Sequence, residues 1–511
     1  MAAKAPDEAA IFDVHSDLLD DPDLAEAVAG KISEGTSAPH AWQSVVEQRA
    51  RQVAALSDPL LAERAADLRD VCRRVLRQLT GAKEQQLPSE PAVIIASDLS
   101  PSDTAALGDV SGPGGVVLGF CTAVGGPTGH AAIIARALRL PAVVGAGSSV
   151  LDIASGTTVI VDGMHGTVTV DPDEQTLAAA RARQKAWQEQ QEAAAAGAAE
   201  AAITRDGHRI EVVANVGSAQ DAREGAQSGA EGIGLLRTEF LFLSREQPPT
   251  EEEQAGVYAT IMAPMAAKPV IVRTLDIGGD KPLPYVEVAP EANPFLGERG
   301  IRLCLNRPEL LRPQIRAILR AAARSEAAVS IMFPMVGDVQ EFRQAQQIVN
   351  EERDALSQDG LALPKVDLGI MVEVPATALM ADCFATEVDF FSIGTNDLTQ
   401  YTLAIDRMHP TLASKSDGLH PAILRLIHKT VQAAHEHGKW AGVCGELGAD
   451  PQAVPLLVGL GVDELSVSVP AIAAVKAQIR TLNLQQCQAL AQKALACATA
   501  QEVRALVVST T

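Results

Sequence analysis

One histidine of the chain stands in a context suited to carrying a phosphoryl group. His130 follows two glycines, Gly125 and Gly126, and the good helix N-cap residue Thr128, and residues 131–138 favour a helix. His130 therefore falls in the first turn of a predicted helix, where the helix dipole and free backbone N–H groups stabilise an anion. The same field disfavours imidazolium and leaves a neutral ring nitrogen to attack phosphorus. The pattern predicts a phosphorylated histidine; the alternative is an ordinary histidine at a helix start.

A second set of residues, far along the chain, has the side chains that bind a small, multiply charged anion together with a metal ion. Arginine grips phosphate or carboxylate with a planar fork of donors, and an amide can donate to a phosphate oxygen. Carboxylates are hard oxygen ligands suited to Mg²⁺. The candidate anion-binding residues are Arg237, Arg273, Arg299, Asn396 and Arg407, and the candidate metal ligands are Glu373 and Asp397.

One cysteine is a candidate for proton transfer to carbon. Cys444 lies in the segment 442–446, at the end of a predicted strand. A cysteine in this setting is more commonly a small buried core residue. If the side chain faces a substrate, its thiol can donate a proton to carbon or remove one. Both interpretations stay open at this point.

The elements that must position these residues are strands that alternate with helices. Eight short apolar strands are predicted after residue 206, and the polar candidates lie at or just past their C-terminal ends. Eight βα units indicate a TIM (β/α)8 barrel, whose enzymes build their sites on that face. The predicted strands are 211–216, 232–236, 270–275, 330–334, 368–374, 389–393, 440–444 and 464–467.

The first 205 residues have a different organisation. Apolar positions recur at helical spacing through 11–82, whereas short strands at 93–96, 115–120, 142–144 and 158–161 predict a compact α/β domain. An Ala- and Gln-rich helix follows with little apolar stripe. We therefore divide the α/β chain into a helical subdomain, an α/β domain, a helical linker and a C-terminal barrel, over residues 1–88, 89–174, 175–205 and 206–511.

Composition excludes several functional classes. The 511 residues carry a net charge of −22, which disfavours a surface for nucleic acid or anionic membranes. The seven cysteines form no C-x-x-C pair, which indicates neither a disulfide framework nor a zinc cluster. No signal peptide or apolar run of membrane-spanning length is present, so we expect a cytoplasmic protein without membrane insertion.

Three segments resemble one family closely. Residues 232–242, 272–281 and 389–407 are similar to Enzyme I of the bacterial sugar phosphotransferase system, a phosphoenolpyruvate–protein phosphotransferase. The resemblance covers nearly the whole chain from Ile11 and implies that residues 89–174 form a swivelling phosphohistidine domain. It also implies that the barrel binds phosphoenolpyruvate and that the helical subdomain binds HPr, the phosphoryl acceptor. Family members are dimers through the barrel domain.

The resemblance assigns a role to each candidate. His130 is implied as the phosphorylated histidine and Cys444 as the proton donor to the enolate that yields pyruvate. Glu373 and Asp397 are implied as ligands of Mg²⁺. The residues implied to bind phosphoenolpyruvate are Arg237, Arg273, Arg299, Asn396, Asp397 and Arg407.

Two features depart from the family pattern. Pro127 and Gly129 replace the Arg and Ser that usually precede the histidine, and this variation resembles the Enzyme I portion of multiphosphoryl transfer proteins. The chain also begins where the family is already within its helical subdomain, so we expect an N-terminally shortened subdomain and a fragment of a longer protein. Two alternatives remain: a regulatory fragment that binds phosphoenolpyruvate without turnover, and a fragment related to pyruvate-phosphate dikinase or phosphoenolpyruvate synthase.

Overall fold

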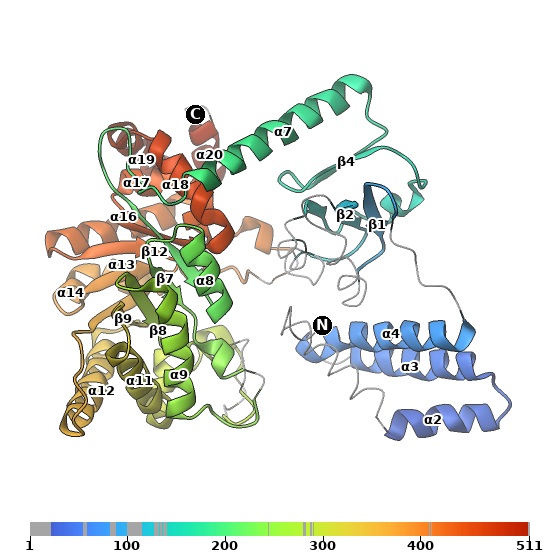
Figure 1. Ribbon diagram of the computed structural model, residues 1–511, viewed down its shortest axis with the longest axis horizontal. Helices are drawn as coiled ribbons and strands as arrows, with labels where there is room; N and C mark the ends of the chain where they lie inside the picture. Colours follow the sequence, from blue (N-terminus) through green and yellow to red (C-terminus); the bar gives the residue numbers. More distant parts are fainter. Residues whose placement is uncertain are drawn as a thin grey trace. The chain divides into compact units, whose positions relative to one another are not determined.

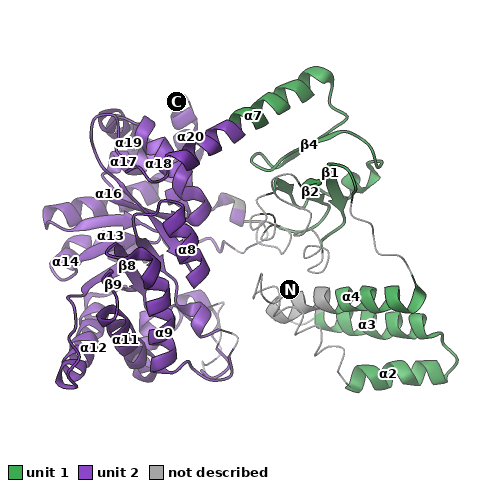
Figure 2. Ribbon diagram, viewed as in Figure 1, with its two compact units in different colours: residues 1–186 green, residues 187–511 purple. Residues whose placement is uncertain are grey.

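The computed structural model describes residues 22–508 apart from 55–58, 82–87, 100–114, 127–131, 133–134, 136–139, 244, 280–282, 287–288, 290, 408 and 410. His130 lies outside the described residues, as do Pro127, Gly129 and almost all of the helix predicted over 131–138. The chain divides into two compact units, residues 1–186 and 187–511, drawn in green and purple in Figure 2. Each unit is described by itself.

The first described part of unit 1, from residue 22, contains three helices that share a small apolar core. Leu24, Val46, Leu68 and Cys72 are among its buried residues, and Trp42 Nε1 donates to the backbone oxygen of Cys72 at 3.3 Å. Apolar side chains at helical spacing create this buried stripe, while charged residues stay on the outer faces. The helices are α2 (Pro22–Ser33), α3 (Ala38–Ala54) and α4 (Pro59–Thr80).

The second part of unit 1 contains a small parallel sheet and a hairpin. The sheet has the strand order β1-β2-β3, and β4 pairs with β5 in antiparallel register. The predicted strands are all present, but β5 was not predicted because its alternating Thr and Val residues are mostly exposed. The bounds are β1 (Ala92–Ala96), β2 (Val117–Thr122), β3 (Ala142–Val143), β4 (Val159–Asp162) and β5 (Thr167–Val170).

Helix α7 (Glu174–Ala196) crosses the boundary between the two units. Within unit 2, the segment that follows it is held by Lys476, which is 1% exposed. The Lys476 ammonium donates to the backbone oxygens of Ala198 at 2.8 Å and Gly229 at 2.9 Å. The C-terminal end of the linker is therefore fixed to the unit that it enters.

Unit 2 is built on a closed barrel of eight parallel strands, which confirms the predicted TIM barrel. Most residues of these strands are buried, because helices cover the outer face of the barrel and side chains fill its interior. Strand β10 ends before the predicted residue 374, which places Glu373 just past the strand. The strands are β6 (Glu211–Val216), β7 (Ile233–Leu236), β8 (Pro269–Arg273), β9 (Ala328–Phe333), β10 (Asp367–Val372), β11 (Phe390–Ile393), β12 (Trp440–Val443) and β13 (Glu464–Ser468).

Helices surround these strands (Figure 1) and cover their outward-facing apolar side chains. Capping boxes fix where α9 and α12 begin, through Thr250 with Glu253 and Asp338 with Glu341. None of the described helices is long and apolar enough to span a membrane. The helices are α8 (Ala219–Gln227), α9 (Glu251–Met262), α10 (Ile301–Asn306), α11 (Pro308–Ala323), α12 (Val339–Gln358), α13 (Pro375–Leu379), α14 (Ala381–Ala385), α15 (Thr395–Leu403), α16 (Pro421–Glu436), α17 (Val454–Leu460), α18 (Ile472–Thr481), α19 (Leu484–Ala496) and α20 (Ala500–Val508).

The inside of the barrel is filled by a separate set of side chains. Met332, Met371 and Cys444 belong to this interior cluster, and the ring of Phe390 stacks on Trp440 with centroids 4.8 Å apart. Alternate residues of each strand point inward, so the interior set is distinct from the core beneath the helices. The inward-facing residues at the C-terminal ends of the strands form the floor of the candidate site.

Candidate active site

The predicted barrel residues come together at the C-terminal ends of the strands. Arg273 is the last residue of β8, Glu373 directly follows β10, and Cys444 directly follows β12. Asp397 lies in the first turn of α15, which directly follows β11. In a parallel barrel these strand ends share one face, so the four side chains line one end of the barrel, here called the mouth.

Arg299 is the most heavily paired residue of this mouth. Its side chain is 2% exposed, and it holds Asp276 with a bidentate fork, Nε to Oδ1 at 3.0 Å and Nη2 to Oδ2 at 3.0 Å. Nη1 donates to Asp397 Oδ1 at 3.0 Å. Burial lowers the pKa of Arg299, but the charges of Asp276 and Asp397 more than offset it and raise the pKa above its ordinary value. Arg299 therefore stays charged and fixes two carboxylates in place.

Arg273 is also buried, yet one of its donors is unused. Its guanidinium pairs with Glu239 Oε1 at 2.9 Å and with Asp276 Oδ2 at 3.3 Å. Its Nε–H has no hydrogen-bond partner among the described residues. A buried donor without a partner costs about 1–3 kcal/mol. An anionic ligand at the mouth would satisfy it.

The remaining cation and amide candidates are more open. Arg237 is exposed, and no ion pair to its guanidinium is found within the described parts of the chain. Arg407 is half-buried and lies 3.5 Å from Asp397 Oδ2. Asn396 uses its Oδ1 to accept from the backbone N–H of Glu446 at 3.0 Å, which leaves the NH2 of its side chain to donate to a ligand. Arg237 and the side-chain NH2 of Asn396 are therefore free to meet an anion that enters the mouth, and Arg407 lies at its edge in a pair with Asp397.

The two candidate metal ligands interact with each other electrostatically. Glu373 is 1% exposed, and its Oε1 accepts from the backbone N–H of Met335 at 2.6 Å. Burial raises the pKa of Glu373 to about 8, and the charges of Asp397 and Asp276 add to the increase. A divalent cation between these carboxylates would relieve that repulsion.

The residues present fit a metal ion that takes part of its coordination from the substrate of the protein. Among the described residues, no group of three His, Cys, Asp or Glu side chains is arranged to hold a metal ion. Mg²⁺ is commonly held by one or two carboxylates together with substrate oxygens and water. Glu373 and Asp397 therefore fit a metal that binds with an anionic substrate rather than a cation held by protein alone.

Cys444 faces the barrel interior at the mouth. Its side chain is 3% exposed, and Sγ contacts the backbone oxygen of Ile393 at 3.6 Å. Burial raises the pKa of the thiol to about 11. The sulfur therefore keeps its proton at neutral pH, as a proton donor must.

Three residues that shape the mouth were not among the sequence candidates. Glu239 and Asp276 pair with the predicted arginines, and Asn215, the residue before the end of β6, donates from Nδ2 to the backbone oxygen of Cys444 at 3.1 Å. Glu239 stands two residues after Arg237, and Asp276 stands three after Arg273. For Glu239 and Asp276, the signal in the sequence was an acidic residue shortly after a strand-end arginine.

Comparison with known proteins identifies the domains in order along the chain. Residues 1–64 match the family described as "PEP-utilising enzyme, N-terminal", and residues 88–166 match "PEP-utilising enzyme, mobile domain". Residues 190–484, which contain the barrel, match "PEP-utilising enzyme, PEP-binding domain".

Relatives match over almost the full chain. The chain is 48% identical to the multiphosphoryl transfer protein of Rhodobacter capsulatus over 98% of its own length and 59% of that protein. It is 46% identical to the phosphoenolpyruvate-protein phosphotransferase of Staphylococcus carnosus over 98% of its length and 87% of that protein. The chain belongs to the phosphoenolpyruvate-protein phosphotransferase family. The enzyme of the same name from Bacillus subtilis is 44% identical over 99% of this chain and 88% of that protein.

Membership of the phosphoenolpyruvate-protein phosphotransferase family confirms the predicted relationship to Enzyme I. It also confirms the prediction of an enzyme that transfers a phosphoryl group from phosphoenolpyruvate within the phosphotransferase system. The roles of individual residues stay predictions.

Proposed function

We propose that this protein takes the phosphoryl group of phosphoenolpyruvate onto His130, passes it to the carrier protein HPr, and releases pyruvate, so that sugar uptake can proceed. The observation that carries the proposal is the mouth of the barrel. There, two buried arginines and the carboxylates of Glu239, Asp276 and Asp397 form one network. A buried Arg273 donor and the exposed Arg237 remain available. Unused cationic donors in an acidic protein suit a small dianion or trianion.

Each residue has a separate task in this proposal. Arg237, Arg273 and Arg407 contact the phosphate and carboxylate of phosphoenolpyruvate, and Asn396 donates to a phosphate oxygen. Arg299 does not contact the substrate in this proposal, because both sides of its guanidinium are already occupied by Asp276 and Asp397. Its task is to hold these two carboxylates in place. Glu373 and Asp397 would hold Mg²⁺, which would supply positive charge to the substrate oxygens.

The chemical steps need a nucleophile and a proton. The neutral nitrogen of His130 forms the new N–P bond while the P–O bond to the enol oxygen breaks, and that electron pair remains on enolpyruvate. Cys444 then donates its Sγ proton to the methylene carbon, which completes pyruvate and leaves a thiolate. The high pKa of the thiol favours transfer to carbon over loss to solvent.

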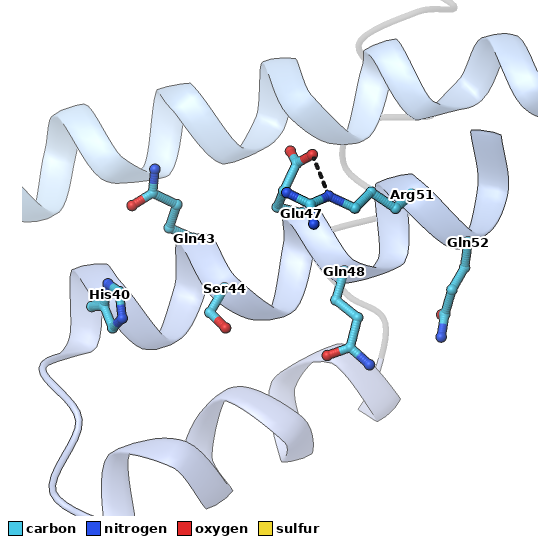
Figure 3. A pocket seen from close by; sticks show the side chains of 7 residues that line it. All are labelled: His40, Gln43, Ser44, Glu47, Gln48, Arg51 and Gln52. Atoms are coloured by element: carbon cyan, nitrogen blue, oxygen red, sulfur yellow. Dashed lines mark hydrogen bonds and ion pairs between the residues drawn. The ribbon is translucent and has the colours of Figure 1, made fainter. Parts of the chain in front are cut away.

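We assign carrier docking to the helical subdomain. A shallow groove of about 750 Å³ runs along α3 and is lined by polar side chains (Figure 3). Glu47 lies within it and is fixed by Arg51 at 3.3 Å and by Arg69 at 3.2 Å. An open groove along one helix suits a protein partner better than an enclosed small ligand. The lining residues are His40, Gln43, Ser44, Glu47, Gln48, Arg51 and Gln52.

The resemblance also supports a homodimer through the barrel domain and a cytoplasmic location, which are part of the same proposal. Peptide mapping after incubation with labelled phosphoenolpyruvate and Mg²⁺ tests the central step. The proposal expects acid-labile label on the peptide that contains His130 and none in His130→Ala. A protein that binds phosphoenolpyruvate but stays unlabelled is a regulatory fragment instead.

A further inference from the structure

Beneath Cys444, a layer of three residues crosses three neighbouring strands inside the barrel, and two of these residues are polar. Ser392 on β11 pairs in register with Gly442 on β12, and Gly442 pairs with Glu464 on β13. Gly442 is two residues before Cys444, so both point to the same, interior side of the sheet. Ser392 and Glu464 therefore lie one layer deeper in the barrel than the thiol.

Two polar groups in this layer are buried and unsatisfied. Glu464 is 4% exposed, Ser392 is fully buried, and neither Glu464 Oε1 nor Ser392 Oγ has a hydrogen-bond partner among the described residues. Buried polar atoms are normally paired with protein or with ordered water. The Ser392 hydroxyl lies close enough to the Cys444 thiol to lower that thiol's pKa, against the larger raising effect of burial. The Ser392 hydroxyl therefore lies near the sulfur and, within the part of the chain that the structure describes, has no other partner that would compete for its proton.

Gly442, which has no side chain, leaves room for the carboxyl group of Glu464. A Cβ atom at this position would lie 3.0 Å from Glu464 Oε1, so the carboxyl group lies over the glycine and toward β11. Ser392 and Glu464 are two strand spacings apart, about 9.6 Å between Cα atoms. Their side chains extend toward each other across Gly442, and one water molecule with hydrogen bonds to both groups would join them.

We propose that Glu464 returns a proton to Cys444 after each turnover, through one buried water molecule and the Ser392 hydroxyl. This proposal rests on the proposed role of Cys444 as proton donor. Glu464 touches neither substrate nor cofactor, so it is a positioning residue that acts through Cys444.

The proton transfers balance along this path. The Cys444 thiolate takes the proton of the Ser392 hydroxyl, the hydroxyl oxygen takes one from water, and the water takes one from the Glu464 carboxyl. The carboxylate then regains a proton from solvent at the opposite end of the barrel. Burial, followed by the charges of Glu211 and Asp463, raises the pKa of Glu464 to about 8, so it holds a proton to give at neutral pH.

Single-turnover and steady-state kinetics separate the relay from a structural role. Without carrier the enzyme stops after one phosphorylation, and this first turnover uses the proton already on Cys444. With excess HPr every later turnover needs a new proton. For Glu464→Gln we expect the single-turnover rate of pyruvate formation to stay within about twofold of wild type. The steady-state rate should fall by about tenfold or more.

Matched variants make each outcome decisive. Ser392→Ala removes the hydroxyl and should show the same split between first and later turnovers, which covers the case in which Glu464→Gln does not fold. Glu387→Gln makes the same change at a surface glutamate that pairs with Arg343, away from the barrel interior, and should leave both rates unchanged. Unchanged steady-state rates in Glu464→Gln and Ser392→Ala would overturn the relay. An equal fall of the single-turnover rate and the steady-state rate in these variants would also overturn it.

Cys444→Ala, measured in the same series, tests separately whether the Cys444 thiol is the proton donor. Slow single turnover in Cys444→Ala together with normal kinetics in Glu464→Gln rejects the relay alone. Normal single turnover in Cys444→Ala rejects the thiol as proton donor, and with it the relay.

Discussion

Arg299 and Asp397 are joined by a buried hydrogen bond of 3.0 Å between Nη1 and Oδ1. A candidate metal ligand is thus held in place by an arginine whose other side grips Asp276. Side chains that orient metal ligands commonly change metal affinity by about 10–100-fold when they are replaced. We therefore propose that Arg299 acts on the metal site rather than by direct contact with the substrate.

Arg299→Lys keeps the charge but removes the planar fork. Because lysine cannot hold Asp276 and Asp397 at once, we expect the Mg²⁺ concentration for half-maximal activity to rise about tenfold or more. A titration of activity with Mg²⁺ at saturating phosphoenolpyruvate measures this. Arg343→Lys, in an exposed pair with Glu387, is the matched control. An unchanged Mg²⁺ requirement in Arg299→Lys would contradict this role.

Arg273 combines a substrate donor with a buried ion pair. Arg273→Leu removes the unused Nε–H and leaves Glu239 buried without its partner, so we expect weaker phosphoenolpyruvate binding and a stability loss of about 3–5 kcal/mol. The double variant Arg273→Leu/Glu239→Gln should recover most of the stability without recovering binding. Calorimetric binding and chemical unfolding measure the two effects. Recovery of binding in the double variant would show that Arg273 acts only through the ion pair.

Cys444→Ala tests the proposed proton donor by separating chemistry from binding. We expect pyruvate formation to fall by about 100-fold or more, because general acid catalysis typically contributes that much. Phosphoenolpyruvate affinity should stay near the wild-type value, since the thiol supplies no charge to the substrate. Cys487→Ala, at another buried cysteine, is the control. Equal losses of binding and turnover would instead indicate a packing role.

The raised pKa of Glu464 leads us to expect that the free energy of unfolding depends on pH. Its pKa is raised from 4.5 to about 8 in the folded state, so its contribution is fully present below pH 4.5 and is lost as pH rises through 8. A tenfold change in a group's acid dissociation constant corresponds to about 1.4 kcal/mol, so the free energy of unfolding falls by a few kcal/mol over this range. Glu464→Gln should therefore gain stability relative to wild type as pH rises across that window. Unfolding curves at several pH values check this, and a constant difference would exclude a buried proton on Glu464.

Much of the barrel could be predicted because its strands are buried on both faces and appear as continuous apolar runs. The arginines followed from the same pattern, since Arg273 and Arg237 stand where those runs end. The partners of these arginines could not be predicted, because pairing between Arg273 and Glu239 depends on how β8 and β7 lie side by side. Strand β5 escaped prediction because its side chains are not buried.

The glutamate inside the barrel shows a different limit of sequence reasoning. Glu464 looks like an ordinary polar residue at the start of a strand, and nothing in its neighbours along the chain marks it as buried. Its importance follows from the register that brings Gly442 and Ser392 beside it. Such a relationship arises only when separate strands close into a barrel.

In the proposed function, phosphoenolpyruvate bound at the mouth of the barrel gives its phosphoryl group to His130. The most direct measurement counts pyruvate released and acid-labile phosphate bound per chain when purified protein meets labelled phosphoenolpyruvate and Mg²⁺ without carrier. We expect about one of each per active site, transfer of the label to added HPr, and neither product in His130→Ala. Pyruvate release without label on the protein, or label that persists in His130→Ala, would contradict it.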